Sequence, residues 1–207
     1  MGLARARDIL LGAPQAKLLL INVELCSLTF SFHDFSKSNL VATALFSDAV
    51  TSALLSGADS ELAGAEMIDS AETTWPDSLD VMGWNLRSDG MQVVFSERIP
   101  RIVEENMREC VDTFLQSSSA KIEDVAHILL HPGGRKVLEA YCKALEIAPE
   151  RLEISCDILR KYGNCSSATV MLVLEEFLHR KKYQPGDLAL ISALGPGFSA
   201  GNVLLEL

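Results

Sequence analysis

The sequence predicts an α/β protein, and two observations support this fold class. Short apolar runs of the kind found in buried strands alternate with longer segments whose apolar residues recur at helical spacing. The chain has 207 residues, of which 48% are hydrophobic and only 6% aromatic. It can therefore bury a sizeable core in one or two domains, built mainly on Leu, Val, Ile and Ala.

The first quarter of the chain predicts helices and strands in alternation. Residues 3–11 have helical composition and end at a turn that contains glycine and proline. Residues 17–23 form an apolar run that predicts a buried strand. A polar stretch leads into residues 39–46, which we expect to be helical. Residues 49–55 favour a strand, with a helix as the alternative.

The middle of the chain is less regular. Residues 57–89 hold Gly, Asp, Ser and Pro between short apolar pieces, and we expect them to connect two domains. Residues 92–95 predict a strand. Pro100 then suits the first turn of a helix, and residues 101–115 keep their apolar side chains at helical spacing.

The second half of the chain predicts regular elements throughout. A strand over residues 127–131 ends at a Pro-Gly-Gly sequence, and two helices follow near residues 135–146 and 149–162. Gly163 suits the position just beyond the second of these helices. Ser166 or its neighbour can cap a further helix.

The C-terminus predicts a β-hairpin. Residues 187–193 and 199–205 are apolar enough for two strands, and a Gly-Pro-Gly turn separates them. The alternation of strand and helix therefore continues to the end of the chain, as an α/β fold requires.

Net charge excludes one class of partner. The formal net charge is -10 and the pI about 4.8, whereas a protein that binds duplex nucleic acid neutralises phosphates with clustered Lys and Arg. The densest basic run, residues 179–182, closes a predicted helix and complements its dipole. No apolar run approaches the roughly 20 residues of a membrane span. We expect a soluble cytoplasmic protein without nucleic-acid partners or membrane span.

Cysteine usage points to reduced thiols. The five cysteines are an odd number, are widely spaced and form no C-x-x-C pair, so neither a disulfide framework nor a metal site is expected. Reduced thiols of a cytosolic protein are the simpler interpretation. The five are Cys26, Cys110, Cys142, Cys156 and Cys165.

Three short motifs carry the candidate active site. They are His-Pro-Gly-Gly at 131–134, Gly-Asn-Cys-Ser-Ser-Ala at 163–168 and Leu-Gly-Pro-Gly at 194–197. Each lies at the end of a predicted element, so their side chains can converge on one pocket. His131 and Asn164 can both donate hydrogen bonds to a thioester oxygen that becomes an oxyanion. Losing one such donor typically raises the barrier by roughly 3–4 kcal/mol.

These motifs, in this order, resemble the type III polyketide synthases, the chalcone and stilbene synthase family. Residues 23–30, Val-Glu-Leu-Cys-Ser-Leu-Thr-Phe, are similar to a strand-end segment of the family, and residues 44–48 are similar to its A-L-F-G-D. The residues that fall in its G-F-G-P-G loop are Gly195, Pro196 and Gly197. The resemblance runs through the whole chain but covers only the C-terminal part of the family's usual length.

The resemblance implies a fold and a subunit contact. The fold is a partial thiolase-like α/β fold, in which residues 1–75 are the remainder of the N-terminal half and residues 76–207 the complete C-terminal domain. The family's strand that matches residues 17–23 lies at a subunit contact, so the resemblance also implies a homodimer.

The resemblance implies acyltransferase chemistry as well. In the family, an acyl-CoA starter loads onto a cysteine, and malonyl-CoA is decarboxylated to an enolate that attacks the acyl thioester. His131 and Asn164 match the family's catalytic histidine and asparagine. Coenzyme A thioesters are the substrates, and no other cofactor or metal is implied.

Five further positions match substrate-binding positions of the family. Phe46 matches a gatekeeping phenylalanine, with a plain core position as the alternative. Cys26, Thr29 and Ser166 match positions that line the elongation cavity, although each could simply be packing. Asn85 falls where plant members have a second gatekeeping phenylalanine, or is an ordinary polar residue near a turn. Without a phenylalanine there the pocket mouth is wider, which implies a long aliphatic starter, as in bacterial alkylpyrone-type synthases.

The expected nucleophile is missing. In the family it lies at the start of a helix rich in Gly and Ala, and residues 1–10 resemble the continuation of that helix. We therefore expect the cysteine just upstream of Met1, and the 207 residues to be inactive alone. Three alternatives stay open: a condensing enzyme like ketoacyl synthase III, a thiol hydrolase with Cys26 as nucleophile, and a non-catalytic fragment that only folds and dimerises.

Overall fold

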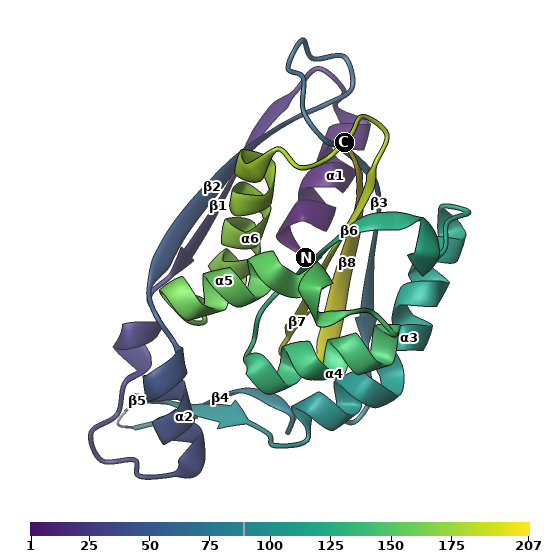
Figure 1. Cartoon of the computed structure of the whole chain (residues 1–207). Coiled ribbons are helices and arrows are strands. Elements are labelled where there is room, and N and C mark those ends of the chain that lie inside the picture. Colours follow the sequence, from purple (N-terminus) through teal and green to yellow (C-terminus); the bar gives the residue numbers. More distant parts are fainter. Residues whose placement is uncertain (89) are drawn as a thin grey trace.

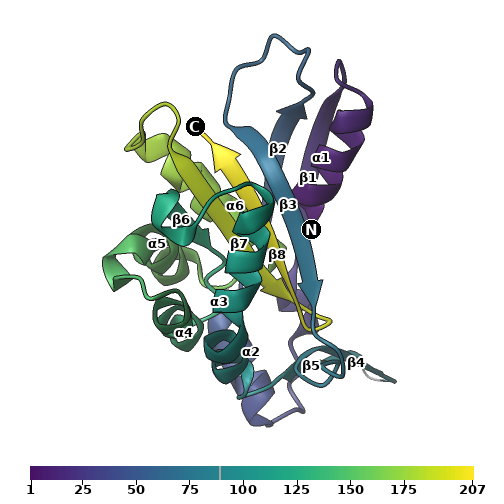
Figure 2. The same ribbon diagram turned by 90° about the vertical axis from the view of Figure 1, so that its right-hand side faces the viewer.

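A four-stranded mixed sheet forms the centre of the molecule. The structure, a computed structural model, describes residues 1–88 and 90–207. The strand order in the sheet is β3-β8-β7-β6. β8 pairs antiparallel with both of its neighbours, and β6 pairs parallel with β7 (Figure 2). The four strands are β3 (Glu66–Thr74), β6 (Val125–Leu130), β7 (Leu188–Gly195) and β8 (Ser199–Glu206).

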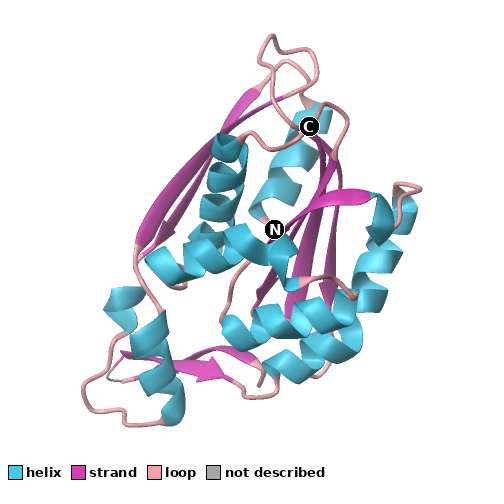
Figure 3. Cartoon of the chain, in the orientation of Figure 1, coloured by secondary structure: helices cyan, strands magenta, loops and turns pink. Residues whose placement is uncertain are grey.

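Helices cover both faces of this sheet (Figures 1 and 3). Alternate side chains of a strand point to opposite faces. Leu190 and Leu204 accordingly join the core formed with α3 and α4, whereas Ile191 and Val203 join the core formed with α1 and α6. The helices are α1 (Gly2–Gly12), α3 (Ile99–Ser117), α4 (Arg135–Leu145), α5 (Glu153–Tyr162) and α6 (Ser167–Arg180).

Most of the expected elements are confirmed. The helix expected over residues 149–162 is divided into a 3₁₀ turn, Pro149–Leu152, and α5. The basic run that closes α6 contains Arg180, whose hydrogen bonds with Asp157 and Glu176 raise the pKa of its guanidinium. The pair with Asp157 joins α5 to α6, whereas Glu176 lies within α6.

A separate two-stranded sheet consists of β1 (Lys17–Glu24) and β2 (Ala49–Ser56), which pair antiparallel. β1 is confirmed as a strand, but the expectation that it is buried was wrong. Its side chains alternate between half-buried and exposed, so that Leu19 is 58% exposed. Only one face of this sheet packs on α1 and α6, which explains the alternation.

A hairpin and a short helix complete the fold. β4 (Met82–Arg87) and β5 (Gly90–Phe95) pair antiparallel, and α2 (Lys37–Leu45) packs beside β5. Gln92 Nε2 donates to Asp34 Oδ2 at 3.0 Å and so joins the hairpin to the loop before α2. In Figure 1 these pieces form the lower end of the molecule.

Residues 57–89, which we expect to connect two domains, also contain two strands that the sequence did not predict, β3 and β4. β3 reads Glu-Met-Ile-Asp-Ser-Ala-Glu-Thr-Thr, whose polar residues hide the apolar pattern of a strand. The backbone groups on one side of β3 pair with β8, and Asp69 accepts a hydrogen bond from Ser117 of α3. The division into domains at residue 75 stays a prediction.

Among the described residues, no helix is both long and apolar enough to cross a membrane. The same residues contain no group of three or more His, Cys, Asp or Glu side chains arranged to hold a metal ion. The five cysteines, all within the described part of the chain, are free thiols.

Candidate active site

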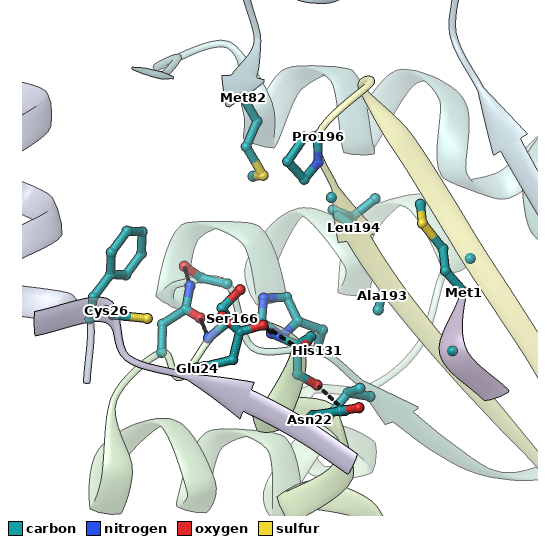
Figure 4. A pocket seen from close by; sticks show the side chains of 18 of the residues that line it. Met1, Asn22, Glu24, Cys26, Met82, His131, Ser166, Ala193, Leu194 and Pro196 are labelled. Atoms are coloured by element: carbon teal, nitrogen blue, oxygen red, sulfur yellow. Dashed lines mark hydrogen bonds between the residues drawn. The ribbon is translucent and has the colours of Figure 1, made fainter. Parts of the chain in front are cut away.

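One pocket of about 540 Å³ is lined by residues from three stretches of the chain, 1–46, 82–99 and 131–203. It lies between the end of β6, the end of β1, the β4–β5 hairpin and the turn between β7 and β8 (Figure 4). Eight of the expected site residues line it: His131, Asn164, Cys26, Thr29, Phe46, Ser166, Gly195 and Pro196. The three sequence motifs therefore do converge on one cavity.

Two expected site residues do not line the pocket. Gly197 lies past the tip of the β7–β8 turn with a φ of 142°, and a Cβ atom there would approach Ser199 Oγ to 3.0 Å. Its contribution is therefore to the turn, while Pro196 faces the cavity (Figure 4).

Asn85 is the second such residue, and here the expectation was wrong. Asn85 is exposed on β4 and does not line the pocket, whereas its neighbour Trp84 does. Successive side chains of a strand point to opposite faces, so Trp84 and its cross-strand partner Val93 face the cavity together. The β4 wall of the cavity therefore carries a large aromatic side chain, and the wider opening stays a prediction.

The Asn164 side chain has a defined orientation. Its Oδ1 accepts a hydrogen bond from the Ser166 N–H at 2.8 Å, and its Nδ2 donates to the carbonyl of Gly133 at 3.2 Å. A primary amide has two N–H donors on nitrogen. One is used by Gly133, so the second can serve a ligand in the pocket.

Backbone pairing holds Asn164 beside Phe46. The Asn164 N–H donates to the carbonyl of Leu45 at 2.8 Å, and the Ser47 N–H donates to the carbonyl of Asn164 at 3.0 Å. This approach requires Gly163, because a Cβ atom there would lie 2.6 Å from the Leu45 oxygen and its φ is 74°. Phe46 lies at the end of α2 and meets Phe95 edge to face at 6.3 Å between ring centroids.

His131 follows β6 directly and is held by the sheet. Its N–H donates to the carbonyl of Ser192 on β7 at 2.8 Å, which continues the β6–β7 ladder. The side chain is buried, and burial lowers its pKa from 6.5 to about 4. At neutral pH the imidazole is therefore neutral and offers one N–H as a donor.

Cys26 is a poor nucleophile. Burial, followed by the nearby carboxylates of Glu24 and Asp48, raises the pKa of its thiol from 9.0 to about 11. Only the thiolate attacks efficiently, and the group is almost wholly protonated at neutral pH. Thr29, at the other end of the 3₁₀ helix Cys26–Thr29, donates its hydroxyl to the Cys26 carbonyl at 2.7 Å. Because the thiol has a raised pKa, Cys26 is poorly suited to be the nucleophile of the thiol hydrolase alternative.

Two polar residues of β1 are among the pocket residues that the sequence did not predict. Glu24 and Asn22 of β1 line the cavity, and both bind Ser167 at the start of α6. Ser166 is the N-cap residue of α6, as expected, but its side chain makes no capping hydrogen bond. A signal for the two residues did exist: they share the covered face of β1 with Leu18 and Leu20, where polar side chains are unusual.

The comparisons with known proteins now identify the family. A family model described as "Chalcone and stilbene synthases, C-terminal domain" matches residues 66–207. The chain belongs to this family. It is 40% identical over 211 residues to a "Putative chalcone synthase" of Bacillus subtilis (strain 168), covering 99% of this chain and 58% of that protein. It is 39% identical over 208 residues to the 1,3,6,8-tetrahydroxynaphthalene synthase of Streptomyces peucetius subsp. caesius, covering 99% and 55%.

The fold is shared with solved members of the family. The crystal structure of PKS-I from the brown alga Ectocarpus siliculosus matches with a TM-score of 0.91 and 27% identity, covering 99% of this chain and 56% of that one. The expected partial thiolase-like α/β fold is thereby confirmed. The chain spans little more than half the length of these relatives.

Proposed function

We propose that the chain carries the oxyanion-binding part of a type III polyketide synthase, an acyltransferase that condenses an acyl-CoA starter with malonyl-CoA. One observation carries the proposal: His131 and the oriented amide of Asn164 line the same pocket, and each retains the capacity to donate a hydrogen bond into it. Membership of the family supports the same reaction class.

In the proposed reaction, the two donors act on the thioester carbonyl oxygen of a malonyl group. The bond between the carboxylate carbon and the methylene carbon breaks, carbon dioxide leaves, and the electron pair forms an enolate whose oxygen bears negative charge. His131 and Asn164 stabilise this oxygen with preformed dipoles. The enolate carbon then attacks the acyl thioester of the starter, and the thiolate leaves. No cofactor beyond the two coenzyme A thioesters is needed.

The acyl-carrying thiol is the element that the five cysteines do not supply. Cys26 has a raised pKa, as do Cys142 and Cys156, in each case mainly through burial. Cys110 and Cys165 are buried, and Cys165 Sγ contacts Ser47 Oγ at 3.1 Å. We therefore propose that the 207 residues by themselves do not condense, and that alone they fold and associate without synthase activity.

The walls of the pocket support a long aliphatic starter. The β4–β5 hairpin presents Met82, Trp84, Met91 and Val93 to the cavity. Unbranched methionine side chains adapt to flexible alkyl chains. Among the described residues that line the cavity, Glu24 is the only Asp, Glu, Lys or Arg, so the cavity favours an apolar substituent. A condensing enzyme like ketoacyl synthase III is the alternative; it uses the same pair of donors.

The exposed face of the β1–β2 sheet supports the proposed homodimer. Leu19 pairs with Leu54, and both are more than half exposed, at 58% and 61%. Contiguous apolar patches of this kind mark protein interfaces. A dimer contact there agrees with the contact expected at residues 17–23. A cytoplasmic location is part of the same proposal, since coenzyme A thioesters are intracellular metabolites.

The experiment separates decarboxylation from condensation. The purified chain is incubated with malonyl-CoA, with and without a long acyl-CoA, and the products are measured by mass spectrometry. We expect acetyl-CoA from decarboxylation, reduced about a hundredfold in His131→Ala and in Asn164→Ala, because each loses one oxyanion donor. Cys156→Ala, which removes an exposed thiol of α5 outside the pocket, is the matched control and keeps the wild-type rate.

Two outcomes contradict the proposal. Equal acetyl-CoA formation in wild type and both donor variants removes the oxyanion role of His131 and Asn164. An alkylpyrone product from the isolated chain shows instead that it needs no further thiol.

A further inference from the structure

The N-terminus of α6 is held by two side chains of β1, although the two elements are far apart in sequence. Glu24 Oε1 accepts a hydrogen bond from the Ser167 N–H at 3.2 Å and a second one from the Ser167 hydroxyl. Asn22 Nδ2 donates to the Ser167 carbonyl at 3.3 Å (Figure 4). A carboxylate at this end of a helix is favoured by the free N–H groups and by the helix dipole. Glu24 therefore supplies the cap that Ser166 does not.

The residue just before this clamp has an unusual backbone conformation. Ser166 has φ 51° and ψ −130°, a region that residues with a side chain rarely adopt. Such a conformation persists only where the surroundings over-determine it. The Ser166 N–H donates a hydrogen bond to Asn164 Oδ1. The Ser166 carbonyl accepts one from Thr169 Oγ1 at 2.9 Å. The bonds from Glu24 and Asn22 fix the residue that follows.

The same contacts orient Asn164. Asn164 Oδ1 accepts its short hydrogen bond from the Ser166 N–H and a longer one from Thr169 Oγ1 at 3.5 Å. The short bond keeps the other end of the amide, Nδ2, directed at Gly133 and the pocket. If Ser167 were released, Ser166 could relax to an ordinary conformation and its N–H would turn away. Asn164 Oδ1 would then lose its short hydrogen bond and keep only the longer one from Thr169 Oγ1 at 3.5 Å, so the amide would be held less firmly.

We propose that Glu24 and Asn22 are positioning residues that act through Ser167 and Ser166 on the side-chain amide of Asn164. They hold the amide with its second N–H directed into the pocket. Only the use of that N–H rests on the proposed function; the orientation itself does not.

The test observes the Asn164 amide directly. Protein labelled with ¹⁵N on asparagine is prepared as wild type, Glu24→Ala and Glu24→Gln, and the Asn164 side-chain signals are assigned by their loss in Asn164→Asp. In Glu24→Ala we expect these signals to shift and their exchange with solvent to rise about tenfold, as expected for one lost hydrogen bond. Glu24→Gln keeps an acceptor oxygen and restores most of the wild-type behaviour.

The control is Asn202, an asparagine buried in β8 whose Nδ2 contacts Cys110 rather than the pocket. Its signals stay unchanged if Glu24 acts on Asn164 specifically. An unchanged Asn164 amide in Glu24→Ala overturns the proposal, and so does an equal change at Asn202, which indicates general loosening. If Glu24→Ala does not fold, the same measurement on Asn22→Ser tests the proposal. This variant removes only the donor to the Ser167 carbonyl, and an unchanged Asn164 amide in it overturns the proposal.

Decarboxylation of malonyl-CoA by the same variants keeps the two proposals apart. A shifted Asn164 amide without any acetyl-CoA formation in wild type leaves the positioning role intact and removes the proposed function. An unshifted Asn164 amide together with normal acetyl-CoA formation overturns the positioning role and leaves the proposed function intact.

Discussion

The four-stranded sheet and the two small sheets contribute to the pocket in different ways. Leu190 of β7 is completely buried, whereas Leu19 of β1 is 58% exposed. His131 lies at the end of β6 and is bonded to β7, so it belongs to the part of the molecule with helices on both faces. The β4–β5 hairpin and the β1–β2 sheet supply the opposite walls and are covered on one side at most.

This difference suggests a division of roles. Catalytic geometry needs rigid support, and densely packed elements open least often. Walls that meet substrates of varying length benefit from being less constrained. Asn164 is the exception that joins the two regions. Its position depends on the α6 terminus, on Leu45 at the end of α2, and on Glu24 of β1 through Ser166 and Ser167.

The largest expected effect tests the contrast in packing. Leu190→Ala removes a fully buried side chain between β7 and the α3–α4 layer, and we expect it to lower the free energy of unfolding by about 3 kcal/mol. Leu86→Ala, the matched change at an 82% exposed position of β4, is expected to alter it by less than about 0.5 kcal/mol. Urea denaturation followed by circular dichroism measures both. Similar losses would remove the distinction between the regions.

The second prediction concerns the pH dependence of stability. The pKa of folded His131 is about 4, below its ordinary value of 6.5, so the unfolded chain binds this proton more readily. The stability that the neutral side chain contributes is present above pH 6.5 and is lost as the pH falls toward 4. The loss over that window is about 3 kcal/mol, from a shift of 6.5 − 4 = 2.5.

Urea denaturation between pH 7 and pH 4 measures this loss, with His131→Gln as the control that cannot titrate. The wild type is expected to lose more stability than the variant, since carboxylates titrate equally in both. Parallel curves for the two proteins would show that His131 is not the buried neutral group described.

The smallest expected effect concerns the hairpin wall. Trp84→Ala removes an apolar side chain from the pocket, and we expect about tenfold weaker binding of decanoyl-CoA by calorimetry with little change in stability. Asn85→Ala, one residue further on the opposite face of β4, is expected to leave the affinity unchanged. Equal effects of the two changes would contradict the assignment of Trp84 to the pocket face.

Local sequence was sufficient for most elements and for the candidate catalytic pair. Helix ends such as Gly163, and strands such as β6 and β7, follow from patterns within a few residues, because capping and side-chain periodicity are local. His131 and Asn164 could be singled out because their chemistry and the order of their motifs are visible without a fold.

Tertiary structure alone decided the rest. β3 is a strand because its backbone pairs with β8, and its polar sequence did not show this. The choice between Trp84 and Asn85 depends on which face of β4 meets the cavity, and a shift of one residue reverses that choice. Glu24 and Asn22 reach α6 across more than a hundred residues of sequence. By itself, therefore, the sequence determined which groups could do the chemistry, because side-chain identity is local. Only packing determined how those groups are held, because it brings together contacts between distant segments.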